Sequence, residues 1–217
     1  MRAITLAVAL LVLAACARDG AEDPPAGARP DARPTGEAEE SPARPMPRVV
    51  VRTRLRPYDI TGSSGVELRA AMQRLGPKDP LSGTPYAGYT RWRIAWSYRV
   101  ERARACEPTS VRVVARIRIT LPRWTGAAQA DPSLAAEWRR FVTALRRHEN
   151  GHAAIARAAA RRIGSRLASL RAFRSCARLA RAADGAAVRI LNNARAAEVA
   201  YDERTRHGDT QGARFSA

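Results

Sequence analysis

Histidine, lysine and cysteine are scarce in this sequence. Its 217 residues include three histidines and three cysteines, and all but one of its 38 basic residues are arginine. The net charge of +18 permits contact with nucleic acid, an anionic membrane or an acidic polymer. The arginines are nevertheless spread over every segment, without the basic run and interleaved aromatic residues of a nucleic-acid-binding module. We therefore expect no nucleic-acid partner.

The N-terminus predicts export. The apolar run over residues 3–15 is too short for a membrane-spanning helix and has the length of the apolar part of a secretion signal. It ends in Leu13-Ala14-Ala15-Cys16, which resembles a bacterial lipobox. We predict a lipoprotein signal peptide over residues 1–16 and lipidation of Cys16. The alternative is an ordinary cleaved signal with an incidental cysteine.

The predicted anchor places the protein in the cell envelope, after secretion across the inner membrane. Ala17, instead of an aspartate, follows the cysteine, which favours the periplasmic face of the outer membrane. Residues 17–47 are rich in Pro, Ala, Gly and acidic residues and predict a disordered tether. The remaining residues, 48–217, are enough for a single domain with its own core.

Export also bears on the other two cysteines. Once Cys16 carries lipid, Cys106 and Cys176 remain as an even pair in an oxidising compartment, which favours a disulfide. In the chain-entropy model, closing a loop of about 70 residues stabilises a fold by about 3–5 kcal/mol. Two unpaired buried thiols are the alternative.

Two stretches alternate apolar and polar residues with the period of a half-buried strand. Residues 91–100 place Trp and Tyr side chains on an expected core face, and residues 111–121 oppose their apolar face with Arg112, Arg116 and Arg118. We expect neighbouring antiparallel strands with the arginine face in solvent. A further strand over residues 49–55 is expected to stop near Pro57, before a short helix over residues 66–75.

From Pro132 the apolar period changes to that of a helix. Apolar residues recur at steps of three and four over residues 134–170, with Asp131 as the expected N-cap and an expected bend or break at Gly164-Ser165. Residues 175–200 predict a second helix, loosened at Asp184-Gly185. The predicted fold is therefore α+β, with a small antiparallel sheet packed on a long helical hairpin that carries the motif described next.

His148-Glu149-Asn150-Gly151-His152 has the HExxH pattern. Histidines four apart share one helix face, and both fall on the buried stripe, so their imidazole nitrogens can reach one zinc ion. Glu149 lies where the carboxylate of HExxH enzymes activates the attacking water as general base. Gly151 leaves room for another segment or for substrate. Two core histidines beside a surface glutamate are the alternative.

A catalytic zinc needs a third protein ligand. The longer metzincin pattern is absent after the motif, so this ligand comes from elsewhere. If the two helices are antiparallel, the C-terminal segment returns beside the motif. That segment contains His207, which we predict as the third ligand of one Zn2+ ion per chain. Asp202, Glu203 and Glu198 are the alternatives.

Other segments add to the motif a resemblance to a known family. They include Leu121-Pro122-Arg123-Trp124 and, most specifically, Tyr201-Asp202 together with Thr205-Arg206-His207-Gly208. With the HExGH motif they resemble an uncharacterised bacterial family of predicted secreted zinc-dependent proteases, from about residue 48 onward. The resemblance implies a zinc metallopeptidase and implies no particular substrate.

Two functions are compatible with this pattern. The first is a zinc metallopeptidase of the envelope, in which His148, His152 and His207 hold zinc and Glu149 is the general base. Its expected substrate is a protein or peptide, or an amide of peptidoglycan. The second is a non-catalytic lipoprotein with a structural zinc and an arginine-rich sheet face for an anionic partner. A structural site has no use for the glutamate, which favours the enzyme.

Overall fold

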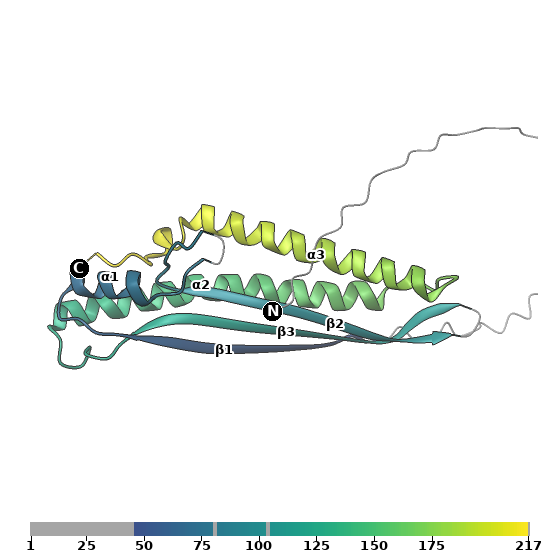
Figure 1. Ribbon diagram of the computed structural model, residues 1–217, viewed down its shortest axis with the longest axis horizontal. Coiled ribbons are helices and arrows are strands. Elements are labelled where there is room, and N and C mark those ends of the chain that lie inside the picture. Colours follow the sequence, from purple (N-terminus) through teal and green to yellow (C-terminus); the bar gives the residue numbers. More distant parts are fainter. Residues whose placement is uncertain (1–45, 80–81, 103–104, 217) are drawn as a thin grey trace, which may run out of the picture. The chain divides into compact units, whose positions relative to one another are not determined.

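The computed structural model of the protein describes residues 46–79, 82–102 and 105–216. The predicted signal peptide with Cys16, and nearly all of the predicted tether, lie outside the described residues. Backbone contacts group these described residues into one unit. In chain order its elements are β1 (Arg48–Ile60), α1 (Gly65–Leu75), β2 (Tyr89–Arg102), β3 (Cys106–Trp124), α2 (Pro132–Ala168), α3 (Cys176–Thr205) and the short 3-10 helix η1 (Asp209–Gln211) (Figure 1). The α+β class is confirmed.

The three strands form one mixed sheet in the order β1-β3-β2. β2 and β3 are antiparallel neighbours, as their alternation predicts, with Trp92 opposite Ile117. β1 pairs with β3 in parallel, so the expectation of a purely antiparallel sheet is wrong. Parallel strands need a long crossover connection, which α1 and β2 provide here. Apolar alternation marks the buried face of a strand but not the direction of its partner, so it could not predict this pairing.

β1 also extends beyond the stop expected near Pro57 and ends at Ile60. β1 is an edge strand, and an edge strand tolerates proline because one of its sides needs no N–H donor. Ile60 is buried and belongs to the same core cluster as Leu68 and Met72 of α1. The strand therefore continues as far as its pairing with β3, whose last pair is Ile60 with Trp124.

α2 packs along β3 and supplies much of the core. Asp131 caps its N-terminus by accepting hydrogen bonds from the backbone N–H groups of Ser133 and Leu134. The core continues along the helix in two apolar clusters. One includes Trp124, Trp138, Phe141 and Phe215, and the other includes Val111, Val113, Ile163 and Leu167.

Both long helices are continuous where the sequence indicated an interruption. α2 does not break at Gly164-Ser165 but continues to Ala168, and α3 passes Asp184-Gly185 and ends at Thr205. Gly164 instead permits close packing, since a Cβ there would lie 3.0 Å from Cγ2 of Val49 in β1. Glycine costs a helix about 1 kcal/mol relative to alanine, and tertiary packing outweighs this cost here.

α3 lies alongside α2 (Figure 1), and residues 169–175 join the two helices. The predicted disulfide between Cys106 and Cys176 is confirmed, and it connects the first residues of β3 and α3, which are 70 apart in sequence. Cys106 and Phe173 also exchange two backbone hydrogen bonds at the same corner. Among the described residues, no helix combines the length and the apolar character needed to cross a membrane.

Candidate metal centre

α2 turns His148, Glu149 and His152 toward the interior of the domain. Their exposed fractions are 4%, 3% and 8%, which is unusual for polar side chains. The two histidines are four residues apart and therefore share a helix face. The same face carries Leu145 and Ala156, both buried, so the packing of α2 on the sheet fixes the direction of the imidazoles.

Asp202 of α3 joins the two histidines. Its Oδ1 lies 3.0 Å from Nε2 of His152 and 3.2 Å from Nε2 of His148, and the two Nε2 atoms are 3.3 Å apart. Ligand atoms of a tetrahedral zinc site are about 3.3 Å apart, because each lies about 2.0–2.1 Å from the ion. The three atoms therefore form a triangle of the size that zinc requires. Among the described residues, no other group of three such side chains brings its ligand atoms this close.

The other ring nitrogen of each histidine faces an acceptor. Nδ1 of His148 lies 3.1 Å from Oε1 of Gln211, and Nδ1 of His152 lies 3.5 Å from Oε1 of Glu198. Amide and carboxylate oxygens accept hydrogen bonds, so a neutral ring carries its proton at Nδ1. Nε2 is then left with a lone pair directed at the cluster, as is usual for histidines that bind a metal.

Glu198 is itself held in place by the sheet. Its Oε1 accepts a hydrogen bond of 2.7 Å from Nε1 of Trp92 in β2. Trp92, expected only as a core residue, thus also orients the partner of His152. Glu198 was one of the alternative zinc ligands, and the structure gives it a position behind His152 instead.

Tyr201 packs directly on the HExxH turn. Its ring stacks on the imidazole of His148, with centroids 5.1 Å apart and planes inclined by 11°. Its hydroxyl donates to the backbone carbonyl of His148 at 3.2 Å. A Cβ on Gly151 would overlap this hydroxyl, so glycine is required there. The expectation that Gly151 admits another segment is confirmed, and the segment is α3.

α3 ends beside the cluster in a left-handed turn. Arg206 and His207 have φ angles of 48° and 53°, and Gly208 follows with 91°. A Cβ on Gly208 would lie 3.0 Å from Cγ of His148, so this glycine serves both the turn and the close approach. The Thr205 hydroxyl donates to the carbonyl of Tyr201 at 2.8 Å and secures the last turn of the helix.

His207 lies at the edge of the cluster. Its Nδ1 is 3.8 Å from Oδ1 of Asp202, its side chain is 64% exposed, and its ring centroid is 6.0 Å from that of Tyr86. The C-terminal segment does return to the HExxH turn, where Asp202 and Gln211 contact the two histidines. The role of His207 as third ligand stays a prediction, whereas Asp202, one of the alternatives, supplies the nearer atom.

Glu149 lies beside the cluster and is held by β2. Its Oε2 accepts a hydrogen bond of 2.7 Å from the Thr90 hydroxyl. Burial raises the pKa of Glu149, against smaller lowering effects of Thr90 and of the two histidines. Gly88 leaves room for the carboxylate, because a Cβ there would lie 2.9 Å from Oε1. A carboxyl group with a raised pKa is suited to accept and return a proton.

The charges of the cluster favour a cation. Burial lowers the pKa of His152, but its hydrogen bonds to Asp202 and Glu198 outweigh burial and raise the pKa to about 9. Burial raises the pKa of Asp202, but hydrogen bonds to His148 and His152 outweigh it and hold the pKa well below its usual range. Two carboxylates thus stabilise positive charge at His152, and a divalent cation on the same atoms would replace that proton.

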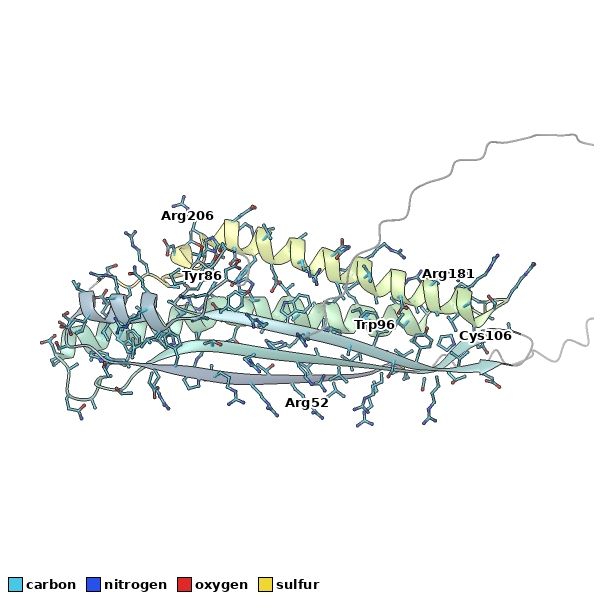
Figure 2. All side chains as sticks on the ribbon, in the orientation of Figure 1. Arg52, Tyr86, Trp96, Cys106, Arg181 and Arg206 are labelled. Carbon is cyan, nitrogen blue, oxygen red and sulfur yellow. A yellow bond between two sulfur atoms is a disulfide. The ribbon has the colours of Figure 1, made fainter. Side chains whose placement is uncertain are left out.

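A cavity of about 230 Å³ opens on these side chains. The four residues His148, Glu149, His152 and Asp202 line it, together with residues 86–90 before and at the start of β2 and with His207. Figure 2 shows Tyr86 close to the end of α3 that carries Arg206. A water molecule occupies about 30 Å³, so the cavity has room for several waters or for a short part of a ligand.

Sequence comparison matches residues 55–208 to the family described as "Bacterial protein of unknown function (DUF922)". The chain belongs to this family. No curated protein and no solved structure matches the chain. The DUF922 description is consistent with the resemblance to an uncharacterised bacterial family and names no activity.

The region shared with the DUF922 family contains the cluster but not every residue that supports it. It includes His148, Glu149, His152 and Asp202, and it ends before Gln211. One signal in the sequence could have identified the residues of α3 that contact the two histidines. Residues 198, 201, 202 and 205 are polar, and each has partners three or four positions away among the other three, so they share one face of a helix. Gln211 lies in the polar tail and had no such signal.

Proposed function

We propose that the protein is a zinc-dependent hydrolase that cleaves amide bonds in the bacterial cell envelope. The observation that carries the proposal is the triangle of His148 Nε2, His152 Nε2 and Asp202 Oδ1 beside the buried Glu149. Two nitrogens and one oxygen are a ligand set typical of catalytic zinc, which keeps a further position for water or substrate. In this proposal α2 and α3 act as one helical hairpin that carries the HExxH motif, and each chain binds one zinc ion.

Glu149 is the residue that would move the proton. A zinc ion bound at the triangle would supply Lewis-acid chemistry, polarising the scissile carbonyl and acidifying the attacking water. Thr90 fixes the Glu149 carboxylate in the wall of the cavity that the ligands also line. There Glu149 would take a proton from the water and return it to the leaving amine, and its raised pKa favours this return.

The arrangement supports catalysis better than a purely structural metal. A structural zinc site encloses its ion with four protein ligands. Among the described residues, three side chains bring ligand atoms within 4.8 Å of one another, and all three line the cavity. A ligand in that cavity would therefore meet the metal and Glu149 together.

The envelope location and the substrate class complete the proposal. Cys16 would anchor the chain after secretion, on the periplasmic face of the outer membrane. The substrate would be a protein or peptide, or the amide of a peptidoglycan stem peptide. Both contain the amide group on which Glu149 and a zinc ion act, so both belong in the test.

The variant Glu149→Gln tests the proposal, because glutamine keeps the size of the side chain and removes the proton-accepting carboxylate. We expect it to bind one zinc ion, like the parent protein, and to hydrolyse amides at least about 100-fold more slowly. Cleavage of a peptide library and of peptidoglycan fragments is followed by mass spectrometry, with zinc content measured in parallel. Glu101→Gln makes the same change at an exposed position of β2 and should keep full activity.

Two outcomes would contradict the proposal. In the first, the zinc-loaded parent protein cleaves neither substrate. In the second, Glu149→Gln cleaves as fast as the parent. The first result would favour the alternative function, a zinc-binding lipoprotein without catalysis. The second would show that Glu149 is not the general base.

A further inference from the structure

The face of the sheet that points away from α2 and α3 carries an array of arginines. Figure 2 shows side chains projecting from this face, Arg52 among them. In the strand register, Arg52 is paired with Arg116 and Arg116 with Arg93. Two residues further along, Arg54, Arg118 and Arg91 form a second row of the same kind. All six side chains of these two rows, called the arginine grid below, are exposed.

A contribution to the stability of the fold does not explain why six arginines lie together on this face. Neighbouring strands are about 4.8 Å apart, and like charges directly opposite each other destabilise a sheet. Within residues 46–79, 82–102 and 105–216, none of the six arginines forms an ion pair or a side-chain hydrogen bond. Arg91 alone has another charge-related contact, over the ring of Tyr89 at 5.7 Å. The grid therefore has capacity for an external anion.

A cavity of about 450 Å³ lies within the grid, and all six arginines line it. A guanidinium group can donate two parallel hydrogen bonds to a phosphate, so several arginines around one depression suit phosphoryl oxygens. Further exposed arginines continue the same face along the strands: Arg48, Arg56, Arg99 and Arg112. From Arg48 to Arg56 the basic surface extends about 26 Å, at about 3.3 Å per residue.

We propose that this face binds the phosphate groups of anionic phospholipids and lies against a membrane surface. A membrane presents many phosphates spread over a plane, which matches an extended sheet face with arginines on all three strands. Sheets that bind single-stranded nucleic acid stack bases on exposed aromatic rings. Here the Trp92 and Trp96 rings point the other way and donate hydrogen bonds to α3. The grid thus has the charges for phosphate but lacks the aromatic platform for bases.

Matched variants test this proposal without any reference to zinc. The chain used is residues 16–217 with Cys16→Ser, so that no lipid is attached. One variant changes the six grid arginines to Gln. The control changes six exposed helix residues to Gln, which removes the same charge: Arg139, Arg140, Arg161, Arg162, Arg181 and Arg195. Binding is measured by co-sedimentation with vesicles of phosphatidylcholine alone or mixed equally with phosphatidylglycerol.

The parent chain should bind only the vesicles that contain phosphatidylglycerol. Each basic residue near an anionic surface strengthens binding about fivefold, so the grid variant should lose at least about 100-fold and the control less than about tenfold. If the sixfold grid variant does not fold, the row variant Arg52→Gln, Arg93→Gln and Arg116→Gln should lose at least about tenfold. Its control changes three of the helix arginines.

Three results would overturn the proposal. The parent could fail to bind phosphatidylglycerol vesicles. The grid variant and its control could lose binding equally, which would show an effect of net charge alone. Finally, the grid variant could keep vesicle binding and lose binding to a DNA duplex, which would assign the face to nucleic acid.

Discussion

Each histidine of the HExxH motif uses its two ring nitrogens for different purposes. The Nε2 atoms of His148 and His152 meet Oδ1 of Asp202, while their Nδ1 atoms meet Gln211 and Glu198. The second set of contacts fixes the orientation of both rings, so the two Nε2 atoms face one point before any ion arrives. Such preorganisation lowers the cost of ordering the ligands when a metal binds.

The raised pKa of His152 predicts that zinc affinity increases with pH. In the metal-free protein this pKa is about 9, so below that pH zinc displaces a proton from the imidazole. Affinity should rise about tenfold per pH unit from about pH 6.5 to 8, with release of about one proton per ion. Titration calorimetry in buffers of different ionisation enthalpy measures both quantities. An affinity that does not change with pH would contradict this account of the cluster.

In the metal-free protein, the raised pKa of His152 also makes the free energy of unfolding depend on pH. The pKa of His152 in the folded chain lies above its ordinary value of 6.5. Its contribution to the free energy of unfolding is therefore fully present below about pH 6.5 and is lost as the pH rises through about 9. Urea unfolding of the metal-free protein at several pH values should show this decline.

The sequence predicts those site residues that one helix brings together. His148, Glu149 and His152 lie within five consecutive residues of α2. Helical spacing alone places the two histidines on one face, and that face is buried. Asp202, Glu198 and Gln211 reach the site through the packing of α3 and the tail, which local spacing does not encode. α3 ends at Thr205, between the candidate ligands Asp202 and His207, and local spacing does not predict which of the two lies nearer to the histidines.

At the scale of elements, α2 and α3 approach each other closely because Gly151 has no side chain. Gly151→Ala places a Cβ against the Tyr201 hydroxyl and should separate the end of α3 from the HExxH turn. Overpacking of this kind costs about 1–3 kcal/mol, and zinc affinity should fall as Asp202 moves. Urea unfolding and zinc titration of the variant measure the two effects.

Gly185→Ala is the matched control for that prediction. It makes the same change inside α3, where the nearest neighbouring atom, Nη1 of Arg189, would be 3.5 Å away. Alanine is the better helix former, so this variant should gain about 0.5–1 kcal/mol of stability. A Gly151→Ala protein as stable as the Gly185→Ala protein would show that the contact with Tyr201 does not constrain the helices.

The elements themselves follow from the sequence where their periodicity is strong. The alternation in β2 and β3 and the three- and four-residue steps of α2 and α3 each gave the correct type of element. The parallel direction of β1 and the continuity of the helices through Gly164 and Gly185 depend instead on tertiary contacts. Those contacts arise between segments far apart in the chain, so local patterns do not contain them.

At the scale of the whole domain, the disulfide and the candidate metal centre lie at opposite ends of α3. Cys176 is its first residue, and Asp202 lies in its last turn. Replacing Cys106 and Cys176 with Ser should lower the free energy of unfolding by about 4 kcal/mol, from the lost constraint on the unfolded chain. The folded protein should still bind one zinc ion. Zinc titration under conditions in which the variant remains folded measures this. Loss of zinc binding by the folded variant would mean that the two ends are coupled.

The domain also separates its two proposed activities onto different faces. The cavity with Glu149 is lined by residues of α2 and α3 and by residues 86–90, whereas the arginine grid occupies the other face of the sheet. A chain held against a membrane by the grid would therefore keep its cavity open to substrates.

Zinc content tests the central claim, that His148, His152 and Asp202 hold one ion. It is measured by elemental mass spectrometry after dialysis of the parent protein and of Asp202→Ala and His207→Ala. We predict about one zinc ion per chain in the parent and in His207→Ala, and less than about 0.1 in Asp202→Ala, which keeps only two ligands. A parent protein without zinc would contradict the account, as would zinc that is lost from His207→Ala and retained by Asp202→Ala.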